Sequence, residues 1–299
     1  AAVEARKHVF LEKPVAVDPV GARSIIASAK KADTIGLSVV TGTQRRHQRD
    51  YIDTYKQVYS GAIGDLVSAN CYWNSGKLWH RNPRPEWTEM EYMIRDWVNW
   101  NWLSGDHIVE QHIHNIDVIN WFMGKFPEKA VGFGSRQRRI TGDQYDNFSV
   151  DFVYEGNIHL HSMCRQINDC ANGVYEYIRG SNGYSNCRSQ IHNPDGTLQW
   201  EYAYPTDENG QKTGLKIPGQ YQEHIDLITA IRTNKPVNEA EQTAKSNLTA
   251  IMGRISAYTG KEVTMEEMMN SDLKLGPSEL KLGKVDMKFE VPVPGSAPA

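Results

Sequence analysis

Two short apolar runs with a helical segment between them open the chain. Residues 8–12, HVFLE, are apolar up to a terminal charge and predict a buried strand, and residues 35–41, IGLSVVT, predict a second one. Between them, alanines and isoleucines recur at helical spacing. Asp18 is a good N-cap and Pro19 suits the first helical position, so a helix begins there. This order predicts a βαβ unit with parallel strands.

The next part of the chain mixes helical and strand patterns. A helix is expected over residues 49–60, a strand over 65–73, and one continuous helix over 107–123 with Asp106 as its N-cap. The segment 74–101 is rich in tryptophan, proline and charge and has no clear period. It is therefore predicted to be a long structured loop.

Strand patterns dominate from residue 129 to about residue 204. Alternating runs are separated by turn signals such as Glu155-Gly156-Asn157, which predicts a hairpin. The expected result is an antiparallel sheet with helices on one face. Helical patterns return over 220–233 and 238–260, Thr264 and Glu267 predict a capping box, and the chain after residue 271 is punctuated by proline and glycine. The fold class is thus α/β followed by α+β.

Composition excludes several classes of protein. With 33 basic and 36 acidic residues, the 299-residue chain has a net charge of -3, which gives no attraction to nucleic acid or an anionic membrane. No apolar run approaches the roughly 20 residues of a membrane-spanning helix. The four cysteines form no CxxC pair, which favours free thiols over a zinc ribbon.

The segment 105–124, GDHIVEQHIHNIDVINWFMG, carries the most informative polar pattern. On a regular helix, His107, Glu110, His114 and Asp117 share one face, and isoleucines line the adjoining face. Three interpretations fit: a salt-bridged surface helix, a metal-binding face, or an acid–base pair of Glu110 and His114. The pattern itself does not choose among them, although the absence of HExxH disfavours a metal site.

Two motifs together resemble one protein family. HVFLEKPVAVD, residues 8–18, resembles the Glu-Lys-Pro motif of the Gfo/Idh/MocA oxidoreductases, which include glucose–fructose oxidoreductase and inositol dehydrogenase. The family's second motif, an acidic residue followed by His and Asp, is similar to Glu110, His114 and Asp117, where family members more often have Asp at the first position. Residues 40–48, VTGTQRRHQ, resemble the family's crossover between domains.

The resemblance implies roles for particular residues. It implies that Lys13, His114 and Glu110 are catalytic, with His114 as general base and Glu110 as its partner. The expected cofactor-binding residues are Glu12, Lys13, Pro14, Gln44 and Arg46, and the expected substrate residues are Asp117, His107, Arg46 and Trp73; no metal site is expected. A cis Lys13–Pro14 bond would suit this arrangement, but the sequence does not decide it.

The resemblance also implies a cofactor, NAD or NADP, and a domain organisation. No GxGxxG motif occurs in the sequence, and a Rossmann domain holds the cofactor's pyrophosphate at such a turn. The chain does not start with Met, so we expect that most of the Rossmann domain, on the order of a hundred residues, precedes Ala1 and that the fragment by itself is inactive. Residues 1–47 would be a Rossmann remnant, 48–271 the substrate-binding domain, and 272–299 an extended tail. Cytoplasmic and periplasmic locations both remain open.

The leading functional hypothesis is an NAD(P)-dependent oxidoreductase that acts on a hydroxyl of a sugar or polyol. Tryptophans concentrate between residues 73 and 102, and aromatic faces suit sugar rings, although packing would explain them equally well. One alternative is an NAD-dependent glycoside hydrolase that oxidises its sugar transiently. The other is a truncated, non-catalytic binding module. In each case the antiparallel sheet is expected to support a homo-oligomer, without nucleic-acid or membrane partners.

Overall fold

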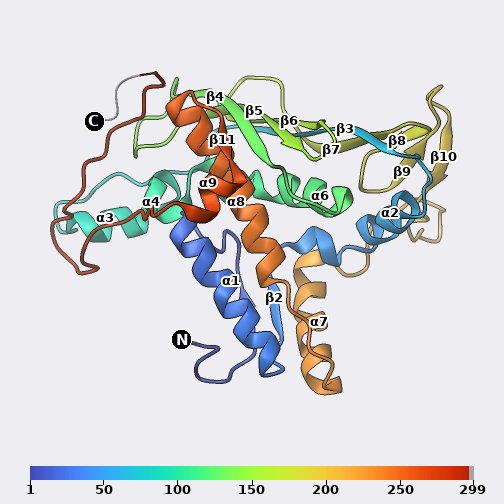
Figure 1. Ribbon diagram of the computed structural model, residues 1–299, viewed down its shortest axis with the longest axis horizontal. Helices are drawn as coiled ribbons and strands as arrows, with labels where there is room; N and C mark the ends of the chain where they lie inside the picture. The colour runs from blue at the N-terminus through green and yellow to red at the C-terminus, as the bar shows by residue number, and fades with distance from the viewer. Residues whose placement is uncertain (296–299) are drawn as a thin grey trace.

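A small parallel sheet and a large, mostly antiparallel sheet form the two parts of the computed structural model, which describes residues 1–295 (Figure 1). In the small sheet, β1 (Val9–Leu11) pairs with β2 (Val39–Thr41) in parallel, and α1 (Pro19–Thr34) connects them. Asp18 caps α1 by accepting a hydrogen bond of 2.7 Å from the backbone N–H of Gly21. The predicted βαβ unit and its N-cap are confirmed.

The second strand begins later than the sequence predicted. Residues 35–38 do not pair with β1 as a strand, because the N–H groups of Ile35 and Leu37 still bond back to the carbonyl of Ala32 at the end of α1. Gly36 allows this turn with a φ of 69°.

The large sheet has nine strands in the order β10-β9-β8-β7-β3-β6-β5-β4-β11. Only the central pair, β3 and β6, is parallel, so the expected mostly antiparallel sheet is confirmed. Burial alternates along β5, as expected for a sheet with one covered face. The strands are β3 (Leu66–Ser75), β4 (Lys129–Ser135), β5 (Asn147–Tyr154), β6 (Ile158–Gln166), β7 (Gly173–Gly180), β8 (Gly183–Ser185), β9 (Gln190–His192), β10 (Leu198–Glu201) and β11 (Val263–Thr264).

Helices cover the face of the large sheet that is turned towards the small sheet (Figure 1). Of these, α6 packs on β3 and β7, whereas α8 packs on β4 and β5 and also contacts α1 and β2. A single long helix therefore joins the two parts. The predicted capping box of Thr264 and Glu267 begins α9. The helices are α2 (Arg49–Tyr59), α5 (His107–Glu110), α6 (Ile113–Met123), α7 (Gly219–Thr233), α8 (Ala240–Thr259), α9 (Met265–Asn270) and the 3-10 helix η1 (Gln44–His47).

The segment 74–101, which the sequence predicted as a loop, contains short helices. These are α3 (Glu89–Arg95) and the 3-10 helix η2 (Trp97–Asn99), followed by α4 (Asn101–Ser104). Thr88 caps α3, and the segment buries two methionines and Trp100 in a small apolar cluster with Trp102 of α4. Val285, from the C-terminal segment, completes that cluster. Because the packing partner lies so far along the chain, the local pattern shows no period.

The predicted continuous helix over 107–123 is wrong, because the chain breaks between α5 and α6. The backbone N–H of His112 bonds to the carbonyl of His107, five residues earlier, in place of the regular spacing of four. The His112 ring is fully buried and lies 2.7 Å from the hydroxyl of Ser162 on β6. We attribute the widened turn to this contact with the sheet.

No helix or strand occurs from Ser271 to Gly295, the last described residue. This segment runs along the edge of the molecule past α3 (Figure 1). Among the described helices, none combines the length and apolar character needed to cross a membrane.

Candidate active site

Lys13 and Glu110 meet where the small sheet faces the helices of the large one. The Lys13 ammonium donates to Glu110 Oε1 at 2.8 Å and also to the backbone carbonyl of Glu110. Their side chains are 15% and 12% exposed, so the pair is largely shielded from water but still accessible from one side. Lys13 lies two residues after the end of β1, and its peptide bond to Pro14 is cis.

His114, at the start of α6, is close enough to Lys13 for the ammonium to act on its ring electrostatically. Its ring stacks on Trp73 of β3, with ring centroids 5.8 Å apart and planes at 27°. Neither ring nitrogen has a hydrogen-bond partner within residues 1–295. Burial, reinforced by the positive charges of Lys13 and Arg45, holds the pKa of His114 well below its ordinary value of 6.5. The imidazole is therefore neutral at pH 7 and can accept a proton.

Glu110 has a different partner from the one predicted. The sequence suggested that Glu110 supports His114, whereas the structure bonds its carboxylate to Lys13. The break between α5 and α6 explains the difference, because it removes the two residues from a common regular helix. Glu110 thus holds the ammonium of Lys13, and His114 is free to contact a ligand.

Arg46 and Asp117, both predicted near the substrate, form a buried pair of their own. The guanidinium binds the carboxylate through two hydrogen bonds of 2.7 and 2.8 Å. Asp117 accepts a further bond of 2.8 Å from Ser246, and Arg46 lies over the Trp121 ring. Neither Arg46 nor Asp117 hydrogen-bonds to the side chains of Lys13, Glu110 or His114. In this arrangement the pair fastens η1 to α6.

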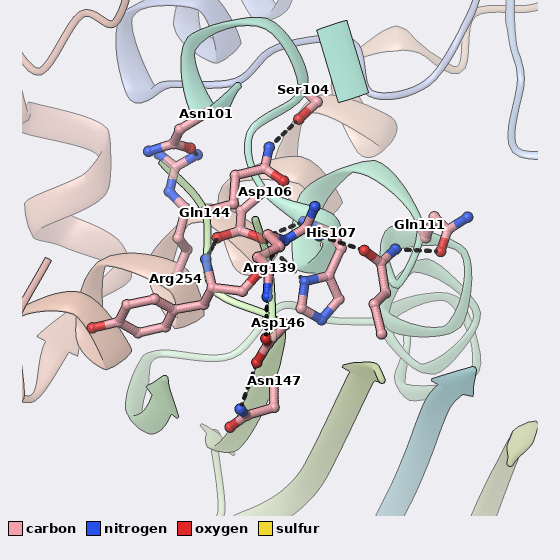
Figure 2. Close-up of polar contacts among 12 residues, drawn as sticks. Asn101, Ser104, Asp106, His107, Gln111, Arg139, Gln144, Asp146, Asn147 and Arg254 are labelled. Carbon is pink, nitrogen blue, oxygen red and sulfur yellow. Dashed lines mark hydrogen bonds and ion pairs between the residues drawn. The ribbon is translucent and has the colours of Figure 1, made fainter. Parts of the chain in front are cut away.

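His107 is also separated from the other predicted site residues. It is buried against Phe148 of β5, and its Nδ1 lies 3.1 Å from a carboxylate oxygen of Asp106 (Figure 2). Asp106 further accepts from the backbone of Tyr145 and the hydroxyl of Tyr258, at 2.9 and 2.5 Å. His107 thus belongs to a network under the sheet and makes no contact with Trp73.

Sequence reasoning missed Arg45 and Glu176. The Arg45 guanidinium lies 5.7 Å from the centre of the Trp73 ring and forms an ion pair with Glu176 of β7. Glu176 also accepts from Asn115 at 2.7 Å, and burial raises its pKa. The crossover motif did indicate two arginines, but consecutive residues of a helical turn point in different directions. Only the fold shows that Arg45, rather than Arg46, faces Trp73.

A polar cavity of about 510 Å³ extends from Arg45 along η1 and β7. Gln44, expected at the cofactor, lines this cavity instead of contacting Lys13. Its remaining walls are rich in hydroxyl, amide and charged groups. The lining residues are Gln44, Arg45, Gln48, Tyr51, Val174, Tyr175, Glu176, Tyr177, Asn186 and Arg188.

The ends of β1 and β2 come close together beside Lys13. Glu12 Oε2 accepts from the backbone of Lys13 at 3.2 Å, and a Cβ added to Gly42 would come within 2.2 Å of that oxygen. A flat ring could be held at such an exposed strand end, at which open α/β sheets bind their ligands. These residues fit the nicotinamide end of a dinucleotide, but no glycine-rich turn for the pyrophosphate occurs in the sequence. Within residues 1–295, no group of three or more His, Cys, Asp and Glu side chains is arranged for a metal ion.

Comparison with known proteins gives a consistent result. Residues 51–185 match the family model described as the GFO/IDH/MocA C-terminal domain. A myo-inositol 2-dehydrogenase of Thermotoga maritima is 30% identical over 135 residues, which is 45% of this chain and 34% of that protein. The aligned regions thus span little more than a third of the length of such curated relatives.

Solved structures share the fold. An oxidoreductase domain protein from Kribbella flavida superimposes with a TM-score of 0.69 at 18% identity, covering 88% of this chain and 75% of that one. GenD2 from gentamicin A biosynthesis, solved in complex with NAD, superimposes with a TM-score of 0.65 at 15% identity, covering 88% and 73%.

Proposed function

Because this chain belongs to the Gfo/Idh/MocA family of oxidoreductases, we propose that it forms the substrate side of an NAD(P)-dependent dehydrogenase that oxidises a hydroxyl of a sugar or polyol. The observation that carries the proposal is the convergence of the Lys13 ammonium with the neutral His114 ring, from positions about a hundred residues apart. An unpaired base can take the hydroxyl proton of an alcohol, and an ammonium beside it can stabilise the alkoxide charge that develops.

The proposed reaction removes two groups from the substrate. The hydroxyl proton passes to a ring nitrogen of His114, which has no competing partner, and general-base catalysis of this kind contributes roughly 10²–10⁴ in rate. Lys13 donates a hydrogen bond to the same oxygen as alkoxide charge develops. Glu110 keeps the ammonium in place. When bound, the nicotinamide would accept the hydride, and Glu12, Lys13 and Pro14 would lie beside it.

A polyol substrate is supported by the surroundings of His114. The Trp73 ring provides an apolar face, and the cavity beyond Arg45 offers many hydrogen-bonding groups. Arg46 and Asp117 act as positioning residues in this proposal, because their charges are already satisfied by each other. His107 has no direct role in it.

We also propose that the large sheet supports a homo-oligomer. Phe133 of β4 is 74% exposed and Tyr175 of β7 is 43% exposed, and strand pairing places both on the outer face, so the sheet offers apolar surface for a second copy.

The test is a panel of neutral and acidic sugars and inositols, incubated with the complete gene product and NAD or NADP. Formation of reduced cofactor at 340 nm, dependent on one substrate and lost in His114→Asn, would support a dehydrogenase. Release of an aglycone without net reduction of the cofactor would instead favour the hydrolase, and activity in neither assay would favour a binding module.

A further inference from the structure

A second cavity, of about 480 Å³, opens where β3 and β6 end and has an unusual charge. Its walls include Lys77, Arg138 and Arg139, against the single carboxylate of Asp169. The local charge is therefore positive, although the whole chain carries a net charge of -3. We call this cavity the basic pocket.

Two cations of the basic pocket have no counter-ion. The Lys77 ammonium and the Arg138 guanidinium are exposed, and neither has a side-chain hydrogen bond or ion pair with any residue of the range 1–295. Arg139, in contrast, is fixed: it donates to Asn99 Oδ1 at 2.7 Å, to the carbonyl of Tyr145 at 2.8 Å, and to the side chain of Gln166. The pocket thus combines one anchored cation with two that can receive a ligand.

The backbone that presents these cations is held firmly. One oxygen of the Asp146 carboxylate accepts from the consecutive N–H groups of residues 137, 138 and 139 at 2.9, 2.5 and 3.1 Å. Figure 2 shows Asp146 beside Arg139. On the opposite wall, Asn168 accepts from the backbone N–H of Lys77 at 2.8 Å. Because the backbone is already fixed, only the side chains of Lys77 and Arg138 lose conformational freedom when a ligand binds.

The basic pocket is also connected to the candidate active site. Gln166, which accepts from Arg139, donates to Gln111 Oε1 at 2.9 Å. Gln111 directly follows Glu110, the partner of Lys13. The hydrogen-bonded chain from Arg139 through Gln166 therefore ends one residue from Glu110.

From these contacts we propose that the basic pocket binds the carboxylate or phosphate group of an anionic sugar. Lys77 and Arg138 would pair with the anion, since charge-assisted hydrogen bonds of this kind are stronger than neutral ones, and Asp169 could accept from sugar hydroxyls. Identification of the ligand as a sugar rests on the function proposed above, whereas the anion site itself does not.

Direct binding to the chain tests this without requiring turnover. Calorimetry would compare glucose, glucuronate and glucose 6-phosphate, with inorganic phosphate and acetate as the bare anions. We expect at least one acidic sugar to bind about tenfold more tightly than glucose, and the preference to weaken as salt rises. The acidic sugar whose affinity exceeds that of glucose by the larger factor, glucuronate or glucose 6-phosphate, shows which anion the pocket prefers.

Variants locate the effect. The double substitution K77Q/R138Q should abolish the preference for the acidic sugar, whereas K216Q/R232Q, which removes two exposed cations elsewhere, should retain it. Both changed pairs are exposed, so the fold should be unaffected, as circular dichroism would verify. Equal binding of glucose and both acidic sugars, or a preference that survives in K77Q/R138Q, would overturn the proposal. Loss of dehydrogenase activity with anion binding intact would count only against the proposed function.

Discussion

Lys13 and Glu110, which are 97 positions apart, form an ion pair with an N–O distance of 2.8 Å. The contact joins the end of a strand in the small parallel sheet to the last residue of α5. It keeps an ammonium next to the unpaired ring of His114, and most of the functional argument depends on that proximity.

Removing the charge at either end of this pair should affect catalysis more than folding. In Lys13→Met we expect kcat to fall by about 10²–10³, because the developing alkoxide loses its donor. In Glu110→Gln we expect a smaller fall in kcat, because the amide oxygen of glutamine can still accept a hydrogen bond from Lys13. Steady-state kinetics of the complete gene product would measure both. A Lys13→Met variant with unchanged kcat and raised KM would limit Lys13 to binding.

The pH profile of oxidation should report His114. Because burial and nearby positive charges lower the pKa of His114, the base stays neutral down to pH values below 6.5. The acid limb of kcat/KM should therefore lie below pH 6.5. Arg45→Gln removes one of the charges and should move that limb upward, whereas Arg49→Gln, an exposed control, should not. An acid limb above pH 6.5 in the wild type would contradict the assignment.

Stability should decline from neutral to alkaline pH because of His47. Burial alone would lower the pKa of His47, but its contacts with Glu239 and Asp226 raise it to about 9. The protonated ring therefore stabilises the fold fully below pH 6.5, and this stabilisation is lost as pH rises through 9. The effect is at most about 3 kcal/mol.

Glu223 should add to the same trend. Burial, with the charges of Glu12 and Glu239, raises the pKa of Glu223 to about 8, against the opposing charge of His47. The folded state thus holds a proton that the unfolded state releases above pH 4.5, so stability falls between pH 4.5 and 8. Denaturant unfolding at several pH values would measure both effects. His47→Gln and Glu223→Gln should each flatten the profile, and equal slopes in all three proteins would refute this account.

Two glycines with similar backbone angles should differ in tolerance to alanine. A Cβ at Gly142, where φ is 71°, would lie 1.6 Å from the carbonyl oxygen of Asn99. Gly142→Ala should therefore destabilise the fold by about 3 kcal/mol or more. Gly36, with φ of 69°, has open space around it, so Gly36→Ala should cost only about 1 kcal/mol. Thermal unfolding would compare them, and similar losses would mean that the loop near Asn99 yields easily.

A lysine on the outer face of the sheet should disrupt the proposed oligomer. Phe133 is 74% exposed, so Phe133→Lys should change the mass measured by light scattering without loss of thermal stability in the monomer. Leu280→Lys, at a site 78% exposed in the C-terminal segment, is the matched control. If the wild-type protein is already monomeric at micromolar concentration, the proposed homo-oligomer is wrong.

Features that depend on neighbours in the chain were determined by the sequence. The Asp18 cap, the Thr264–Glu267 capping box and the strand alternation involve groups only a few residues apart, so their energetics are visible in a short window. The Glu-Lys-Pro and Glu110–His114 motifs likewise named two segments that the structure brings into contact at the candidate site. Mostly antiparallel pairing followed from the hairpin turns.

Features that depend on distant partners were decided only by the tertiary structure. The turn between α5 and α6 widens where His112 contacts Ser162. As a result, Glu110 binds Lys13 and not His114. The same packing buries His107 and turns Arg45 towards Trp73. In each case the free-energy cost of burying a polar side chain is offset by its interaction with a partner tens of residues away. A short window of sequence does not contain the distant partner, so its pattern of polar and apolar residues cannot predict these contacts.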